Sequence, residues 1–400
     1  MEVLSNWQQE FDSLMRRLKP RFAHSQSRKW ARAYVQGLLS NVPRKNGWQL
    51  AETVGATTPY GLQQFVYRAK WEADDIRDDL REYVVEQLGD PAAVLVIDET
   101  GFVKKGSHSV GVQVQYCGTV GRTTNCQVGV FLTYASPQGA TFLDRVLYLP
   151  ESWTSDRERC REAGVPDEVA FATKPELARQ MLQRAVEAGV PAAWVTGDSV
   201  YGGHSGLCNW LEAQPLAYVL TVSPKDTLIN LEWYPQRVST WLADLPTQGW
   251  RRLSAGEGSK GPRLYDWLRL PLYDPPVTDW KRWLLLRRSL ADPSHVTPYV
   301  CFAPAETALE ALVRVAGTRW TIESSFESTK QEVGLDEYEV RSYQGWYRHI
   351  TLACLTHAFL TVLRAHGLDP LTEPEKKPSP APQPTSSLST FKARRGLISP

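Results

Sequence analysis

The sequence predicts an α/β protein in which a helical amino-terminal region precedes a mixed β-sheet. The prediction rests on two short apolar runs and on the helix between them. Residues 93–98 (Ala-Val-Leu-Val-Ile-Asp) and 193–198 (Ala-Trp-Val-Thr-Gly-Asp) each have the length and composition of a buried strand. Residues 174–188 have the apolar periodicity of an amphipathic helix. Both strands end on an aspartate, Asp98 or Asp198, where open α/β sheets place their ligands.

Residues 1–90 are predicted to be helical, and part of this region has the outline of a helix-turn-helix. A short helix at 48–55 ends on a glycine, and Thr58 and Pro59 open a second helix that runs to about residue 70. Any helical hairpin shares this outline, so an ordinary hairpin is the alternative to a DNA-reading role. The second helix offers side chains that can reach base edges or phosphates: Tyr60, Gln63, Gln64, Tyr67 and Arg68.

The amino-terminal region is also basic, although the whole chain is close to neutral. The 400 residues include 45 Lys and Arg against 44 Asp and Glu. Residues 1–50 hold nine basic and three acidic residues, a net charge of +6, with Arg44 and Lys45 next to the candidate helix-turn-helix. Such a local excess suits a phosphate backbone, and a solvated helix face is the other interpretation.

Composition argues against several other classes of protein. The six cysteines are scattered without a Cys-x-x-Cys pair, so neither structural zinc nor a disulfide framework is expected. No signal peptide opens the chain, and no apolar stretch reaches the ~18–20 residues that a membrane span needs. These features predict a soluble, cytoplasmic protein with no membrane partner.

The elements around the two aspartates follow the order of a known type of sheet. Further strands are expected at 110–116, 126–134 and 140–149, between the strand that ends at Asp98 and the amphipathic helix. This order matches a ribonuclease-H-like sheet, in which the strand with the first aspartate lies beside the strand with the second. We therefore expect Asp98 and Asp198 to meet although they are 100 residues apart in the sequence.

Shifts in composition divide the chain into five regions. The acidic helix at 72–89 is expected to be a solvated connector between the first two. The aromatic residues of the third region are expected either to form its core or to stack on unpaired bases. The regions are a helical, helix-turn-helix-like DNA-binding domain (1–90), the first part of a catalytic core (91–222), a β-rich insertion (223–281), the remainder of the core (282–369) and a disordered tail rich in Pro and Ser (370–400).

A third acid completes a candidate metal site. Glu323 lies in a predicted helix and, with Asp98 and Asp198, would supply three carboxylates. Phosphoryl transfer on DNA uses two divalent cations ~3.5–4 Å apart, and Mg²⁺ prefers hard oxygen ligands. Asp98 would bridge both ions, and each of the other acids would favour one of them. For a single aspartate considered alone, a loop cap or a salt bridge is the simpler interpretation.

The helix around Glu323 has two distinct faces. At about 100° per residue, Arg319, Glu323 and Lys330 fall on one edge of the helix. A carboxylate between two cations suits metal binding by Glu323 and phosphate binding by Arg319 and Lys330. The alternative is an ordinary surface ion-pair ladder. The neighbouring apolar stripe consists of Ile322, Phe326, Thr329 and Val333.

The spacing of these three charged residues resembles a family signature. Arg319, Glu323 and Lys330 form the pattern Arg-x₃-Glu-x₆-Lys, which resembles the end of the Tyr-Arg-Glu-Lys signature of DDE transposases from bacterial insertion sequences. The tyrosine of the signature falls on Ala316, so that element is absent from this chain.

Three further stretches are more specific. Residues 98–106, 115–118 and 125–128 are similar to the transposases of the insertion-sequence family designated "seven-oh-one", within the IS-four-like superfamily. The pair Tyr201-Gly202 after the second aspartate also agrees with that family. The resemblance covers roughly residues 10–365.

The resemblance implies a DDE-type polynucleotidyl transferase that performs cut-and-paste transposition. Asp98, Asp198 and Glu323 would be its catalytic and metal-binding triad, with two Mg²⁺ ions for which Mn²⁺ can substitute. Its partners would be double-stranded DNA, as terminal inverted repeats and target, in the bacterial cytoplasm and nucleoid. Cleavage of two ends implies at least a dimer on DNA. The expected DNA contacts are Arg319, Lys330, Lys104, Lys105, Gln63, Gln64, Tyr67, Arg68, Arg44 and Lys45.

Other functions share some of these features. A catalytically silent or domesticated DNA-binding regulator would keep the fold without strand transfer, and the three acids argue against it. A metal-dependent nuclease without joining would use the same site. A hydrolase based on Cys208 or His204 is less favoured because no nucleophile-elbow or Cys-His pattern surrounds them.

Overall fold

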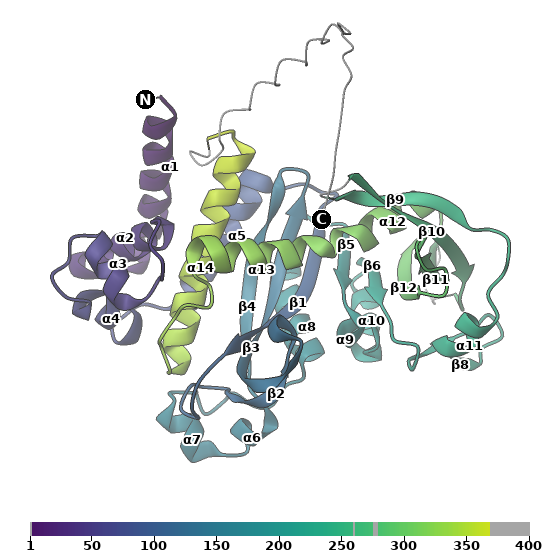
Figure 1. The fold of residues 1–400 in the computed structure, drawn as a ribbon, viewed down its shortest axis with the longest axis horizontal. Helices are drawn as coiled ribbons and strands as arrows, with labels where there is room; N and C mark the ends of the chain where they lie inside the picture. The colour runs from purple at the N-terminus through teal and green to yellow at the C-terminus, as the bar shows by residue number, and fades with distance from the viewer. Residues whose placement is uncertain (1, 259–260, 275–278, 369–400) are drawn as a thin grey trace, which may run out of the picture.

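The structure, a computed structural model, describes residues 2–258, 261–274 and 279–368 (Figure 1). The tail predicted at 370–400 lies outside this range. All six cysteines are buried and free of disulfide bonds. Within the described ranges, no helix is long and apolar enough to cross a membrane.

The centre of the protein is a ten-stranded mixed sheet (Figure 1). Its strands are β1 (Val94–Val103), β2 (Gln113–Cys117), β3 (Arg122–Ser136), β4 (Gly139–Tyr148), β5 (Trp194–Gly197), β6 (Ala217–Thr221), β9 (Arg251–Gly258), β10 (Gly261–Pro271), β11 (Trp280–Arg288) and β12 (Val296–Pro304). Their order is β2-β3-β1-β5-β6-β12-β11-β10-β9, and β4 pairs with β3. The predicted α/β class is confirmed, and the sheet is compatible with a ribonuclease-H-like core.

The two aspartate-bearing strands are neighbours, as predicted. β1 pairs with β5 in parallel, from Val94 opposite Trp194 to Ile97 opposite Gly197. The expectation that the first strand ends at Asp98 was wrong. β1 continues to Val103 because the long strand β3 supplies antiparallel partners along its whole length. What ends beside Asp98 is the pairing with β5.

Helices cover both faces of the sheet. The principal ones are α5 (Ala73–Leu88), α8 (Lys174–Glu187), α12 (Leu309–Thr318), α13 (Trp320–Val333) and α14 (Tyr343–Ala365). Shorter helices are η2 (Gly118–Val120), α6 (Glu151–Thr154), α7 (Arg157–Glu162), α9 (Ser199–Gly202) and α10 (Ser205–Ala213).

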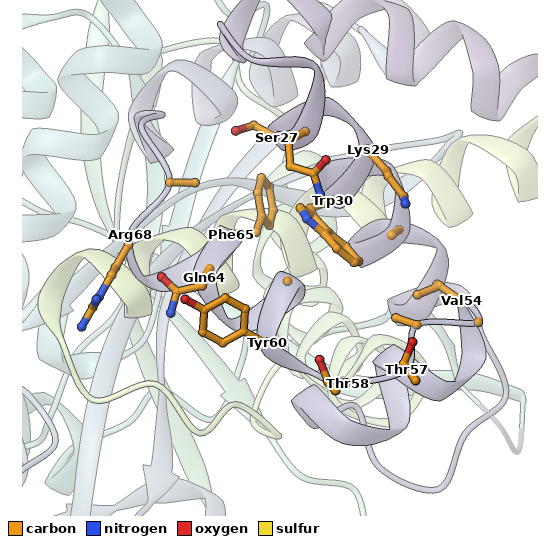
Figure 2. Close-up of a pocket in the computed structure, with 16 residues that line it drawn as sticks. Ser27, Lys29, Trp30, Val54, Thr57, Thr58, Tyr60, Gln64, Phe65 and Arg68 are labelled. Atoms are coloured by element: carbon orange, nitrogen blue, oxygen red, sulfur yellow. The ribbon is translucent and has the colours of Figure 1, made fainter.

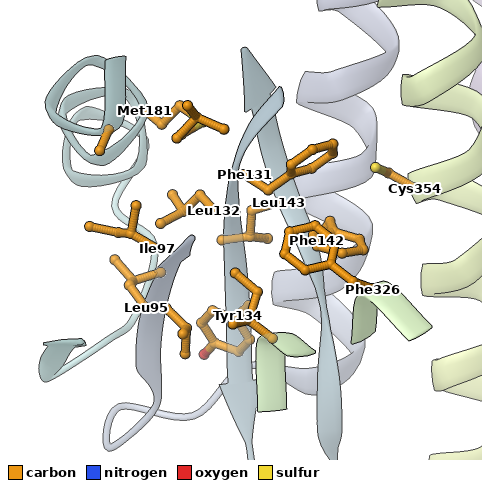
Figure 3. Packing of buried hydrophobic residues seen from close by; sticks show 14 of the residues in the cluster. Leu95, Ile97, Phe131, Leu132, Tyr134, Phe142, Leu143, Met181, Phe326 and Cys354 are labelled. Atoms are coloured by element: carbon orange, nitrogen blue, oxygen red, sulfur yellow. The ribbon is translucent and has the colours of Figure 1, made fainter. Parts of the chain in front are cut away.

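Alternation along the strands decides which helix each side chain meets. Figure 3 shows Met181 of α8 on the same side of the sheet as Ile97 and Leu132. On the other side, Phe131 of β3 packs against Phe326 of α13, with ring centroids 5.2 Å apart. Since neighbouring residues of a strand point to opposite faces, odd-numbered residues of β1 near Ile97 face α8 and even-numbered ones face α13.

The acidic helix α5 is not the solvated connector that its charge suggested. It packs against α14 and β4 and buries an apolar face that includes Ile76 and Leu80. Asp79 is 3% exposed and accepts two hydrogen bonds from Arg21, at 2.7 and 2.8 Å. Burial of the apolar stripe outweighs the high charge of the helix because its acids pair with arginines.

The amino-terminal region is helical, as predicted. It contains α1 (Glu2–Leu18), η1 (Lys19–Arg21), α2 (Ser25–Leu39), α3 (Gly47–Thr53) and α4 (Tyr60–Tyr67). The predicted pair of helices corresponds to α3 and α4, but α4 is shorter than expected. Pro59 precedes α4 as its N-cap residue instead of lying in its first turn. These helices rest on α14, where Tyr34 and His349 share a 2.8 Å hydrogen bond.

The region expected as an insertion is β-rich, but much of it continues the main sheet. A small hairpin of β7 (Thr227–Ile229) and β8 (Pro235–Arg237) is followed by α11 (Val238–Ala243). β9 and β10 then extend the sheet beyond β11. Of the aromatic residues in this region, Trp267 is fully buried, as expected for a core, whereas Trp233 is 68% exposed. Stacking on unpaired bases stays a prediction.

Candidate active site

Asp98 and Asp198 lie one residue beyond the last parallel pair of β1 and β5. Asp98 is an even-numbered residue opposite Phe131, so it faces α13. Asp198 ends its strand and begins α9, where its carboxylate caps the helix by accepting a hydrogen bond from the Val200 amide at 2.9 Å. The sequence prediction that the two aspartates come together is consistent with this register.

Burial and charge repulsion act on both aspartates. Burial, followed by the negative charges of Asp198 and Glu99, raises the pKa of Asp98 to about 8. Burial and the charge of Glu99 also raise the pKa of Asp198. The guanidinium of Arg319 acts in the opposite direction on both pKa values. Two neighbouring carboxylates that resist ionisation favour a proton or a cation at this place.

Arg319 connects Glu323 to the first aspartate. Its guanidinium lies 2.9 Å from Glu323 Oε1 and 3.9 Å from Asp98 Oδ2. Arg319 stands at the junction of α12 and α13, as the C-cap residue of the first helix and the N-cap residue of the second. The predicted stripe of apolar residues on α13 is buried, which orients the Glu323 edge of this helix along the sheet.

The three predicted metal ligands are engaged in different ways. Among the described residues, no three His, Cys, Asp or Glu side chains are grouped so that they could hold a metal ion. Asp98 and Asp198 are hard oxygen donors whose mutual repulsion a divalent cation would relieve. Glu323 is paired with Arg319. The three-carboxylate site therefore stays a prediction, and it requires Arg319 to release Glu323.

Two of the predicted DNA-contacting lysines are bonded inside the protein, and one of them, Lys330, lies near Asp98. Lys330 donates to Thr100 Oγ1 at 2.8 Å, and Thr100 is two residues beyond Asp98 on β1. Burial lowers the pKa of Lys330. Lys104 donates to the Tyr338 carbonyl at 3.2 Å, and burial lowers its pKa to about 8. Lys105 is exposed.

The predicted contacts in the amino-terminal region are unequally available. Arg44 and Arg68 are exposed, whereas Gln63 and Gln64 are half-buried. Lys45 is only 5% exposed and donates to the Ser40 carbonyl. The Lys45 ammonium is therefore bonded inside the protein, and contact of Lys45 with DNA stays a prediction.

A groove of about 710 Å³ lies between α2 and α4 (Figure 2). Tyr60, Gln64 and Arg68 line it from α4 and its end, and Lys29 and Trp30 line it from α2. Tyr67 is outside the groove and donates a hydrogen bond to the Glu339 carbonyl at 3.3 Å. The groove thus combines two cations with aromatic side chains on one face of the helical region.

Sequence reasoning assigned no role to three residues that link β1 to the helices before and after β5. Glu99 Oε2 accepts a hydrogen bond from the Tyr201 hydroxyl at 2.6 Å. Glu99 Oε1 accepts another from Lys174 Nζ, also at 2.6 Å. We call these three residues the Glu99 network. A signal was present in the sequence, because Glu99 follows the first aspartate and Tyr201 lies three residues after the second.

Comparison with known proteins gives two matches. The family described as "DDE superfamily endonuclease" matches residues 17–237, a range that contains Asp98 and Asp198 and ends before Glu323. The chain is also 25% identical over 317 residues to a protein of Microchaete diplosiphon described as "Probable transposase for insertion sequence element IS701". The match covers 77% of this chain and 75% of that protein.

Proposed function

Because the chain belongs to the DDE superfamily endonucleases and is a transposase of the insertion-sequence type, we propose that it binds the terminal inverted repeats of its element and cuts and joins DNA with Mg²⁺. The observation that carries the proposal is the register of β1 and β5. It ends the parallel pairing next to Asp98 and Asp198, and Arg319 brings Glu323 to the same place.

The acids suit the metal chemistry of phosphoryl transfer. Asp98 and Asp198 would hold the divalent cation, and Glu323 would join them once Arg319 has left it. A bound Mg²⁺ supplies two things in such reactions: a lower pKa for the attacking hydroxyl or water, and stabilisation of the negative charge that develops on phosphate oxygens.

Arg319 is the residue through which DNA would free Glu323. Its guanidinium now contacts carboxylates of Asp98 and Glu323. Like a carboxylate, a phosphate presents two oxygens that can accept both N–H bonds of the planar guanidinium fork, and Arg binds both groups well. A DNA phosphate that binds the Arg319 guanidinium would leave the Glu323 carboxylate without its partner and available to a metal ion. Lys330, which donates to Thr100, would provide a second positive charge that binds a DNA phosphate.

We assign recognition of the DNA ends to the amino-terminal helices. α3 and α4 form the predicted helical pair, and Arg44 and Arg68 are exposed beside it. Phosphate contacts by such residues position a protein on DNA, while polar side chains of a helix read base edges. Gln63 and Gln64 are the candidates for reading. At least two copies of the chain would act together, since an element has two ends.

The test is cleavage and joining of a labelled duplex that carries the element's own terminal repeat. Wild type and Asp98→Asn would be compared in Mg²⁺, Ca²⁺ and EDTA, with Asp292→Asn in the turn between β11 and β12 as the control. We expect Mg²⁺-dependent nicked and joined products that disappear only in Asp98→Asn. Nicked products without joining would indicate a nuclease. Binding of the ends by wild type without any cleavage would contradict the proposal and favour a silent regulator.

A further inference from the structure

The Glu99 network lies on the opposite side of the sheet from Asp98. Glu99 is the next residue of β1, so alternation turns it away from α13 and toward α8. Its two partners come from the starts of two helices on that side: Lys174 is the first residue of α8, and Tyr201 lies in α9. One carboxylate on β1 therefore bonds to the helix that leads toward β5 and to the helix that follows it.

The backbone alone does not join the two aspartates. The ladder between β1 and β5 ends at Ile97 and Gly197, one residue short of Asp98 and Asp198. The hydrogen bond of 2.6 Å between Tyr201 and Glu99 crosses from one strand end to the other beyond this point. Tyr201 is fully buried, so solvent does not compete for its hydroxyl, and such a bond is costly to break.

Lys174 gives the network its charge balance. Asp98, Glu99 and Asp198 would place three negative charges at adjoining strand ends. The Lys174 ammonium, 2.6 Å from Glu99 Oε1, compensates the charge of Glu99. The side chains of Lys174 and Glu99 are 26% and 18% exposed, so water screens this ion pair only in part.

From this geometry we propose that Glu99, Lys174 and Tyr201 are positioning residues. They hold the carboxylates of Asp98 and Asp198 at the separation and orientation that a divalent cation requires. The inference rests on the proposed function, because it takes the two aspartates as the metal ligands. Residues that orient ligands in this way typically contribute about 10–100-fold to metal affinity when they are tested by mutation.

The same fold contains a chemically matched network away from the aspartates, which serves as the control. Glu212 of α10 accepts a 2.8 Å hydrogen bond from the hydroxyl of Tyr218 on β6 and pairs with Arg282 on β11. We call these residues the Glu212 network. Tyr218 is as buried as Tyr201. Removal of either hydroxyl therefore leaves the glutamate of its network with one hydrogen bond fewer.

The experiment compares Tyr201→Phe with Tyr218→Phe in the full-length protein. Binding of Mn²⁺ alone, without DNA, is measured by electron paramagnetic resonance of the free ion, and thermal unfolding is measured in EDTA. We expect Tyr201→Phe to weaken Mn²⁺ binding about tenfold and to raise the Mg²⁺ concentration for half-maximal cleavage by a similar factor. Tyr218→Phe should lower the unfolding temperature but leave both metal dependences unchanged.

Equal Mn²⁺ affinities of the two variants would overturn the inference and make the Glu99 network a structural feature only. If Tyr201→Phe does not fold, Glu99→Gln replaces it, because Gln keeps an acceptor for Tyr201 and removes the charge that binds Lys174. Unchanged Mn²⁺ affinity in that variant would also overturn the inference. Asp98→Asn separates the two proposals. If it leaves Mn²⁺ binding intact, the aspartates are not the metal ligands and the proposed function itself fails.

Discussion

The Glu99 and Glu212 networks are built from the same kinds of side chain. Each has a glutamate that accepts a hydrogen bond from a buried tyrosine and pairs with a cation, Lys174 in one and Arg282 in the other. Each joins a helix to strands of the same sheet. They differ in what lies beside them. The Glu99 network adjoins Asp98, within β1, and Asp198, just after β5. The Glu212 network joins α10 to β6 and β11, which both pair with β12.

The difference teaches that the chemistry of a buried polar network does not reveal its role. At Glu212, continuous pairing from β6 through β12 to β11 already holds the strands together, so the network adds mainly stability. At Glu99, the parallel pairing stops before the aspartates, so the same bonds control the position of side chains that no backbone ladder holds. Perturbation of each network should therefore change a different quantity.

The largest difference in cleavage rate is expected between Asp198→Asn, beside the Glu99 network, and Glu212→Gln, within the Glu212 network. Asp198→Asn keeps an acceptor for the Val200 amide, so the cap of α9 persists. It removes a proposed metal ligand, and loss of several kcal/mol of charge stabilisation corresponds to about a thousandfold slower cleavage. Glu212→Gln should cleave at the wild-type rate. Single-turnover cleavage of the repeat duplex measures both rates. A similar loss of rate in both variants would contradict the proposed difference between the two networks.

A smaller effect is expected from Arg319. Arg319→Ala removes the cation that contacts Asp98 and Glu323, and in the proposed mechanism it also removes a phosphate contact. Loss of one such electrostatic contact costs about a hundredfold in rate. Binding of the DNA ends in EDTA should weaken as well. Arg252→Ala is the control, because Arg252 is an exposed arginine of β9 that pairs with Asp266 of β10 and contacts neither Asp98 nor Glu323 among the ion pairs of the described residues. An Arg319→Ala variant with normal cleavage would rule out this role for Arg319.

The cations of the two networks offer a third test. Lys174→Met leaves Glu99 without its compensating charge next to two aspartates, so the three acids repel each other more strongly. We expect Lys174→Met to weaken Mn²⁺ binding about tenfold. Lys174→Arg should restore the affinity in part. Arg282→Met should reduce thermal stability without a change in Mn²⁺ affinity. Isothermal titration with Mn²⁺ distinguishes these outcomes, and identical affinities for both Met variants would contradict the comparison.

The smallest effect is a gain of stability without metal. Burial and neighbouring charge raise the pKa of Asp98 from 3.8 to about 8. A carboxyl with a raised pKa in the folded state favours folding below its unfolded pKa, and this contribution is lost as the pH rises toward 8. In EDTA at pH 8, Asp98→Asn should therefore unfold about 2–4 °C above wild type. The gain should vanish near pH 4, whereas Glu212→Gln should be destabilised throughout. If calorimetry shows that the difference in unfolding temperature between Asp98→Asn and wild type does not depend on pH, the raised pKa of Asp98 is contradicted.

Local patterns predicted much of the fold. The apolar runs before Asp98 and Asp198 became neighbouring strands. The stripe of Ile322 and its neighbours is buried on α13. These features are encoded by periodicity within one element, which a single sequence displays directly. Errors arose where an element's partner mattered: the length of β3 extended β1 past Asp98, and packing on α14 buried the acidic helix α5.

The sequence by itself determined the types of side chain at the site and the order of the elements that carry them. It placed an acid after each of two strands and a third on a helix with Arg319 and Lys330. Only the tertiary structure decided how those side chains are engaged. It paired Glu323 with Arg319, bonded Lys330 to Thr100 and joined Glu99 to Tyr201. The reason is physical: periodicity acts over a few residues, whereas a hydrogen bond between residues 99 and 201 depends on strand register and on alternation across the sheet.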